Sequence, residues 1–219
     1  MAISKIKWRG FRLRSEEGGK GAAAVAAHAG DHPHGRIGPN ALIQTVRALQ
    51  EQYNEATLLA ILQQSGQEYL LHRDPAGMVQ EQEFAALVTA LAAQLGVSAA
   101  RAILHRSGQL TAAYLLHYRI PRPFQRLLKP LPQRLALKLL LWAISKNAWT
   151  FAGSGHFAYK VGKTSRLTVT SHIQPVAAAC GFYGGTFEHL IHVLINPKAI
   201  MQMEVLMNGG QPYCVYTFN

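Results

Sequence analysis

The last third of the chain, from His156 to Phe218, places the strongest constraint on the fold. It begins with two β-rich runs, Phe157 to Val161 and Leu167 to Ile173, which are separated by the polar turn Gly162 to Ser165. Short β-rich runs on either side of a Gly-containing polar turn are typical of a hairpin. We therefore expect two antiparallel strands here.

A Gly-rich helix and a second hairpin follow. The segment AAACGFYGGTFEHLIHVLI has the length and apolar content of a helix. Beyond it, the runs Ile200 to Met207 and Tyr213 to Phe218 flank Asn208-Gly209-Gly210, a strong turn signal. The glycines Gly181, Gly184 and Gly185 each cost about 1 kcal/mol relative to alanine in a helix, so we expect another helix or a flat ligand to approach them closely.

The residues before this region predict helices. Apolar residues recur with a helical period from Asn40 onward, and EQEFAALVTALAAQLG predicts a further helix. The expected helix starts are Asn40, Asn54 or Thr57, Ser98 and the residue after Pro132, and the expected ends lie near Gly66, Gly96 and Pro121. Helices followed by strands indicate an α+β fold, with a helical N-terminal half packed on a small antiparallel sheet of two hairpins flanking the Gly-rich helix.

Composition sets the domain organisation. Residues 1–35 are basic and Gly/Ala-rich and predict a flexible leader, and residues 36–219 predict a single domain with a helical part, 36–150, and a sheet part, 156–219. No run reaches the eighteen or so apolar residues that span a bilayer, and the basic start lacks the apolar core of a secretory signal. We expect a cytoplasmic protein in which the two cysteines are reduced and buried or bound to a metal.

The positive charge of the chain is unevenly distributed. The formal net charge is +11, and no acidic residue occurs between Glu83 and Glu188. We call residues 84–187 the acid-free stretch; its twelve Lys and Arg residues fit a solvated basic face, an anionic ligand, an acidic protein partner or an anionic membrane surface. Nucleic acid is not expected as a partner, because no nucleic-acid-binding motif accompanies the charge.

The sequence contains no nucleotide-binding motif that meets its structural requirements. Gly153 to Ala158 matches the loose dinucleotide pattern, but it precedes a predicted strand where a helix is required. Gly162-Lys163-Thr164 lacks the glycine that a phosphate-binding loop needs five positions earlier, where Phe157 stands. No nucleotide cofactor is therefore expected.

Several ordered blocks resemble one known family. RIGPNALIQ, LLLWAISKNAWTFAGSGHFAY, CGFYGGTFEHLI and MEVLMNGGQPYCVYTF are similar to the bacteriochlorophyll 4-vinyl reductase family, which carries a 4-vinyl-reductase domain. The resemblance covers Arg36 to Phe218. It implies an α+β fold akin to the TRAPP vesicle-tethering subunits and to the sensor domains of phenol-responsive activators, and it implies a homodimer.

The sensor relatives imply a zinc site. Cys180, Glu204 and Cys214 match three of its four ligand positions, and Met207 stands at the remaining position. A thioether is a poor zinc ligand, so the three donors leave a weak site unless a His or water completes it. The alternative is that both cysteines are ordinary buried residues.

The resemblance further implies a tetrapyrrole ligand, such as a magnesium porphyrin. Such a ligand has a flat apolar face, carboxylates and a central metal that accepts an axial His or water, which Trp, Phe, Tyr, Arg and His side chains could bind. The candidate ligand-binding residues are Arg122, Arg126, Trp142, Trp149, Phe151, His156, Phe157, His172, Phe182 and Tyr183. Each aromatic residue has a core role as its alternative.

Three functions are open at the level of sequence. The first is a tetrapyrrole-binding accessory or carrier protein of bacteriochlorophyll synthesis, which acts on or delivers a divinyl protochlorophyllide or magnesium porphyrin and works with pathway enzymes such as magnesium chelatase. The second is a 4-vinyl reductase that uses an external electron donor, because neither a nucleotide loop nor an iron–sulfur cysteine set is present. The third is a scaffold for an acidic partner, and peripheral contact with the photosynthetic membrane is open in each case.

Overall fold

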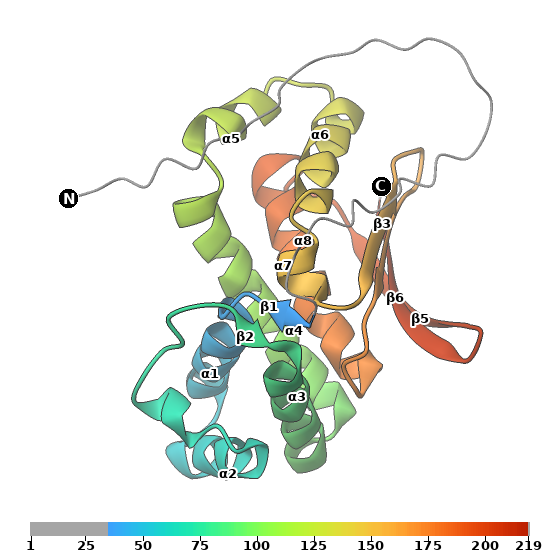
Figure 1. The fold of residues 1–219 in the computed structure, drawn as a ribbon. Helices are drawn as coiled ribbons and strands as arrows, with labels where there is room; N and C mark the ends of the chain where they lie inside the picture. The colour runs from blue at the N-terminus through green and yellow to red at the C-terminus, as the bar shows by residue number, and fades with distance from the viewer. Residues whose placement is uncertain (1–34, 219) are drawn as a thin grey trace.

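The computed structural model describes residues 35–218, which form helices beside one four-stranded sheet (Figure 1). The leader predicted over residues 1–35 lies outside the described residues except for Gly35. The helices among the described residues are α1 (Asn40–Gln52), α2 (Glu55–Ser65), α3 (Glu81–Leu95), α4 (Val97–Tyr114), α5 (Arg122–Leu128), α6 (Gln133–Ser145), α7 (Trp149–Ala152) and α8 (Val176–Leu194), with a 3-10 helix, η1 (Glu68–Leu71), and a π-helix, η2 (Leu115–Arg119). The strands are β1 (Arg36–Ile37), β2 (Val79–Gln80), β3 (His156–Lys160), β4 (Ser165–Thr170), β5 (Met201–Asn208) and β6 (Gln211–Phe218).

Both predicted hairpins form, and they join into one sheet. The strand order is β3-β4-β6-β5, and every neighbouring pair is antiparallel. β4 ends at Thr170, three residues before the predicted end at Ile173, and the chain then turns into α8. Side chains alternate across the sheet, so Leu167 and Val169 are buried beneath α8 while Arg166 is exposed on the outer face.

Local capping explains both ends of α2. The Asn54 side chain accepts a hydrogen bond from the Thr57 backbone N–H at 2.9 Å, so Asn54 is the residue that opens α2. Gly66 ends that helix in the left-handed conformation, with φ +69°. Ser98 was expected to cap the fourth helix, but α4 already begins at Val97, so that prediction is wrong.

Close backbone contact between α4 and α8 joins the helical half to the sheet half. Gly181 and Gly185 of α8 lie against the backbone carbonyls of Arg101 and His105, and a Cβ atom at either glycine would overlap them. Gly108 of α4 meets the backbone of α8 in the same way. The two helices approach this closely because glycine has no side chain at the crossing.

The glycine-rich pattern of α8 is therefore explained by helix packing. Of the two alternatives that the sequence allowed, a helix rather than a flat ligand lies against Gly181 and Gly185. Gly184 points the other way and contacts the ring of Tyr216 in the sheet. The sequence also predicted that the helical half packs on the sheet; instead α8 lies between α4 and the sheet, while α6 and α7 contact β3 (Figure 1).

No helix within residues 35–218 combines the length and the apolar character that crossing a membrane requires.

The α4–α8 crossing predicts a sharp difference between two Gly→Ala variants. Gly185→Ala adds a methyl group where backbone atoms already fill the space, whereas Gly77→Ala adds one where no atom lies within 4 Å. Overpacking costs about 1–3 kcal/mol, and the better helix propensity of alanine returns up to about 1 kcal/mol. We expect chemical denaturation to show a net loss of about 1–2 kcal/mol for Gly185→Ala and little change for Gly77→Ala; equal stability of the two variants would contradict the packing.

Candidate functional site

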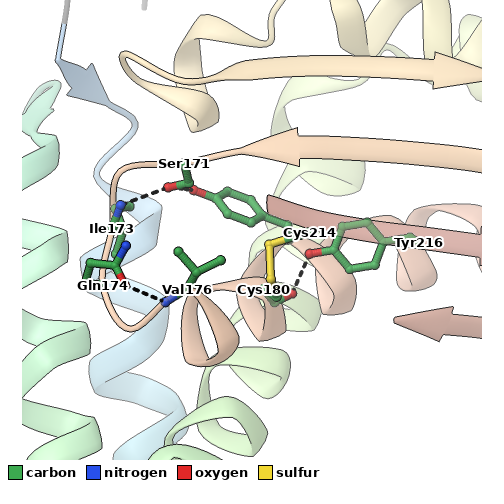
Figure 2. Close-up of a disulfide and its surroundings, with 8 residues drawn as sticks. Ser171, Ile173, Gln174, Val176, Cys180, Cys214 and Tyr216 are labelled. Carbon is green, nitrogen blue, oxygen red and sulfur yellow. Dashed lines mark hydrogen bonds between the residues drawn. A yellow bond between two sulfur atoms is a disulfide. The ribbon is translucent and has the colours of Figure 1, made fainter. Parts of the chain in front are cut away.

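A disulfide occupies the position of the predicted metal site. Cys180 of α8 and Cys214 of β6 are both fully buried and are joined to each other, with their Cα atoms 5.6 Å apart. Figure 2 shows the bond between the helix and the sheet, beside the Tyr216 hydroxyl, which donates a hydrogen bond to the Cys180 carbonyl at 2.7 Å. The disulfide therefore links α8 covalently to the strand that it covers.

Strand register explains why Glu204, the third predicted ligand, and Met207, the residue at the fourth position, are absent from this point. Cys214 pairs with Val205, whereas Glu204 pairs with Val215, so Glu204 lies on the outer face of the sheet. Met207 shares the inner face with Cys214, but it lies near the end of the hairpin and is 65% exposed. The four residues do not converge.

These positions correct the expectation of reduced or metal-bound cysteines. Both sulfurs are committed to each other, and the carboxylate of Glu204 lies on the opposite face of the sheet, so the residues do not fit a zinc ion. Within residues 35–218, no three His, Cys, Asp or Glu side chains gather in a way that could hold a metal ion.

Most of the predicted aromatic ligand residues lie in the core between α7, α8 and the sheet. Phe151, Phe157 and Phe187 contact one another, with ring centroids 5.6 to 6.0 Å apart. On α8, Phe182 packs edge-on against Phe84 at 5.2 Å, and Tyr183 lies 6.3 Å from Phe151. Protein atoms already cover these rings, so ligand contact by Phe151, Phe157, Phe182 and Tyr183 stays a prediction.

Two tyrosines within this core are neutral. The Tyr183 hydroxyl donates a hydrogen bond to Ser171 Oγ at 3.2 Å, and burial raises its pKa to about 12. Burial also raises the pKa of Tyr216 well above its ordinary value. Because each hydroxyl already has a hydrogen-bond partner, both tyrosines satisfy the requirement for buried polar groups and act as core residues.

The remaining predicted residues are dispersed over the molecule. Trp142 on α6 is 41% exposed, and Trp149 is partly buried at the start of α7. His156 is exposed on the outer face of β3, opposite to the side on which Phe157 packs. His172 is exposed in the loop after β4. The structure therefore does not gather the predicted residues into one pocket, and their roles stay predictions.

Arg122 and Arg126 lie beside a feature that the sequence did not reveal. α4 ends in the π-helix η2, in which the Ile120 N–H donates to the Leu115 carbonyl at 2.7 Å. Single π-helical turns are rare and occur often at functional sites. The next residues turn sharply at Pro121 into α5, which carries both arginines on exposed positions.

A side chain of α5 holds this turn. The Gln125 amide Nε2 donates to the carbonyls of Leu116 at 2.6 Å and Ile120 at 2.8 Å. Helix ends leave carbonyls without intrahelical partners, and here one amide satisfies two of them. The turn is therefore fixed relative to α5.

Aromatic rings project from the π-helix. Tyr118 is 68% exposed, and its ring centroid lies 4.3 Å from that of His117 and 5.0 Å from that of Tyr114. The imidazole of His117 is also exposed. The exposed rings of His117 and Tyr118 offer a surface on which a flat apolar molecule can lie.

Three arginines follow these rings along the chain, Arg119 in η2 and Arg122 and Arg126 in α5. Arg119, Arg122 and Arg126 are exposed, and none of them forms a salt bridge with another described residue. We call the six residues of this region the π-helix surface: Tyr114, His117, Tyr118, Arg119, Arg122 and Arg126. Guanidinium groups bind carboxylates through paired hydrogen bonds, so this surface suits a molecule that is flat, apolar and anionic.

Of these six residues, sequence reasoning found only Arg122 and Arg126. The available signal was the cluster YLLHYR immediately before a proline, in which rings at positions 114 and 118 share a helical face. The π-helical turn itself could not be read from the sequence, because it depends on the hydrogen bonds of Gln125.

Comparison with known proteins found two similar curated sequences. The chain is 32% identical over 187 residues to the bacteriochlorophyll synthase 23 kDa chain of Rhodobacter capsulatus, covering 83% of this chain and 84% of that protein. It is 30% identical over 187 residues to the protein of the same name from Cereibacter sphaeroides, covering 82% and 88% of the two chains. Neither relative is named a 4-vinyl reductase, and no family model matches the chain.

Solved structures with a similar fold belong to a different group from the one expected. One, from work probing the function of heme distortion in the H-NOX family, has a TM-score of 0.54 at 11% identity and covers 83% of this chain and 94% of its own. Another, from work on modulating heme redox potential through porphyrin distortion, has a TM-score of 0.53 at 11% identity and covers 83% and 99%.

The TRAPP-like, 4-vinyl-reductase-type fold predicted from the sequence is therefore wrong, and the fold is that of the H-NOX structures. The prediction rested on separate blocks of sequence, which reveal local elements such as the hairpins. They do not reveal how the helices and the sheet are arranged relative to one another.

The Cys180–Cys214 disulfide predicts that the protein is less stable when reduced. The bond closes a loop of 34 residues, which corresponds to about 3–4 kcal/mol in the chain-entropy model. We expect a reductant to lower the melting temperature of the purified protein and to release two thiols on unfolding.

The double variant Cys180→Ala, Cys214→Ala is the control for this measurement. Its melting temperature should not respond to reductant, because it has no disulfide to lose. Two free thiols in unfolded, non-reduced protein would show that the disulfide does not form.

Proposed function

Because this chain belongs to the family of the bacteriochlorophyll synthase 23 kDa chains, we propose that it takes part in bacteriochlorophyll synthesis as a tetrapyrrole-binding protein. In this proposal it holds or delivers a divinyl protochlorophyllide or a magnesium porphyrin to an enzyme of the pathway. The single observation that carries the assignment of a site is the π-helix surface, with its exposed rings and with arginines that form no salt bridge within residues 35–218.

The chemistry of this surface matches the ligand class. The macrocycle of a tetrapyrrole is flat and apolar and would lie on the ring of Tyr118. Its carboxylates would pair with Arg122 and Arg126, since guanidinium groups bind carboxylates bidentately. The imidazole of His117 would be available to a central metal, as histidine commonly serves as an axial ligand of tetrapyrrole metals.

The fold comparisons agree with this ligand class without identifying the site. The two solved structures described above concern heme, which is itself a tetrapyrrole. At 11% identity the likeness concerns the fold alone, so the residues that hold the ligand are argued from this chain.

We favour a carrier over an enzyme because the proposed surface is open. A carrier must release its ligand to a partner, which an exposed surface allows, whereas enclosed pockets bury most of a small molecule. In the reductase alternative, an external donor such as a reduced ferredoxin would supply electrons to the same bound pigment.

The scaffold alternative is favoured by one specific observation. The exposed arginines of α5 lie in the acid-free stretch and have no acidic partner among the described residues. An acidic surface on a pathway enzyme, such as magnesium chelatase, would complement them, and such a complex would weaken steeply with salt.

A titration tests the proposed site. Magnesium protoporphyrin added to micromolar protein should shift its Soret band and quench tryptophan fluorescence. The variant Arg122→Ala, Arg126→Ala should bind at least about tenfold more weakly, because hydrogen bonds to charged groups contribute about 1.5–3 kcal/mol each. Tyr118→Ala should weaken binding as well, and His117→Ala should change the Soret position if the imidazole binds the metal.

Lys163→Ala, Arg166→Ala is the matched control for the arginine variant. It removes two exposed basic residues of the same acid-free stretch from the hairpin of β3 and β4, and it should bind like the unchanged protein. Absence of any Soret shift would sink the proposed function. Loss of the 8-vinyl group from bound pigment on addition of NADPH or reduced ferredoxin would replace the carrier by the reductase.

A further inference from the structure

One face of α6 is apolar, basic and open to solvent. Leu135 is 53% exposed and Trp142 is 41% exposed, and Leu139 lies between them on the helix and is partly buried. Lys138 and Lys146 are exposed at the margins of the same face. These positions are three, four, seven and eleven residues after Leu135, which places them on one side of a helix with 3.6 residues per turn. We call these five residues the α6 face.

The opposite side of α6 is buried and packs in the core. Ala136, Leu137, Leu140 and Leu141 point into the core, and α6 packs there against β3. Leu139 contributes partly to this core, whereas the exposed Leu135 and Trp142 are not required for the packing of the helix. An exposed tryptophan and leucine on an otherwise well-packed helix indicate a surface that contacts something else.

The positive charge around the α6 face indicates an anionic partner. Besides Lys138 and Lys146, Arg134 on α6 and Lys129 after α5 are exposed, and none of the four forms a salt bridge with a described residue. α5 and α6 lie together at one end of the molecule, away from α1, α2 and α3 (Figure 1). This end therefore concentrates positive charge around an apolar stripe, and no acidic residue of the described part of the chain forms a salt bridge with it.

We propose that the α6 face docks on the surface of an anionic lipid bilayer. Leucine and tryptophan side chains insert shallowly at the boundary between headgroups and acyl chains, where tryptophan is enriched. Lysines at the margin of such a stripe remain at the level of the anionic headgroups and bind them. An acidic protein would also attract the charge, but it does not account for exposed apolar side chains about two turns apart on the same face, at Leu135 and Trp142. The inference stands independently of the tetrapyrrole proposal, because it uses none of the residues of the π-helix surface.

Co-sedimentation of the full chain with vesicles tests this proposal. We expect binding to vesicles made of equal parts phosphatidylcholine and phosphatidylglycerol, and little binding to phosphatidylcholine alone. Binding should fall between about 0.1 M and about 1 M salt, where the Debye length shrinks from roughly 10 Å to roughly 3 Å.

Charge reversal on the α6 face separates it from the other basic parts of the chain. Lys138→Glu, Lys146→Glu should weaken binding to the anionic vesicles at least about tenfold, since each basic residue near such a surface contributes about one factor of five. Lys160→Glu, Lys163→Glu is the matched control, because it changes the net charge equally at exposed positions of β3 and its turn. It should bind nearly as well as the unchanged protein.

A second pair of variants tests the contribution of apolar side chains to vesicle binding. Leu135→Ser, Trp142→Ser should weaken vesicle binding, whereas Ile200→Ser, Val205→Ser removes two exposed apolar side chains elsewhere and should not. The far-ultraviolet circular dichroism of all four variants verifies that they are folded.

Three results would overturn the proposal. The first is absence of binding to anionic vesicles. The second is equal binding by the Lys138→Glu, Lys146→Glu variant and the unchanged protein, which would place the contact elsewhere in the chain. The third is an equal loss in the variant and its matched control, which would reduce the effect to net charge. Salt-sensitive capture of an acidic pathway enzyme without vesicle binding would point to the protein partner instead.

Discussion

The contact between α4 and α8 is the interaction on which the rest of the structure depends. Gly181 and Gly185 allow the two helix backbones to touch, so α8 can lie against α4 on one side and the sheet on the other. From α8, the Cys180–Cys214 disulfide and the aromatic core extend into the sheet. A side chain at either glycine would separate the helices and with them the two halves of the molecule.

The sequence predicted the elements of the sheet half well, because their signals are local. Alternating β-rich runs and Gly-containing turns locate both hairpins, and the glycines of α8 correctly indicated a close neighbour. The disulfide, the π-helix and α5 were not predicted, because each depends on contacts between distant parts of the chain or on a tertiary hydrogen bond, such as that from Gln125 to Leu116. The three predicted zinc ligands do not converge for the same reason: strand register places Glu204 on the face opposite Cys214.

The fold determines which basic residues of the acid-free stretch have acidic partners. Arg106 lies within it but forms a two-bond ion pair with Glu51 of α1, at 2.6 and 3.0 Å, and this hydrogen bond lowers the pKa of Glu51. His105 likewise lies 3.0 Å from Glu188 of α8. Acidic residues from outside the stretch therefore compensate the middle of α4, while the basic residues of α5 and α6 form no salt bridge with any residue between 35 and 218. The positive charge is concentrated at one end of the molecule by folding rather than by sequence alone.

The π-helix surface and the α6 face lie on neighbouring elements at the basic end of the molecule. Their electrostatic interactions with a ligand or a membrane act over different distances. Arginine pairs on a carboxylate act through short hydrogen bonds with fixed geometry, so salt weakens them modestly. Lysines at a lipid surface act as point charges over about a Debye length, so salt weakens them strongly. The residues largely follow this distinction, since the basic residues of η2 and α5 up to Arg126 are arginines, whereas the α6 face carries Lys138 and Lys146, with Arg134 nearby on the same helix. If both proposals hold, the pigment binds at the π-helix surface while the neighbouring α6 face contacts the membrane. The bound pigment would then lie close to the lipid phase in which such apolar molecules dissolve.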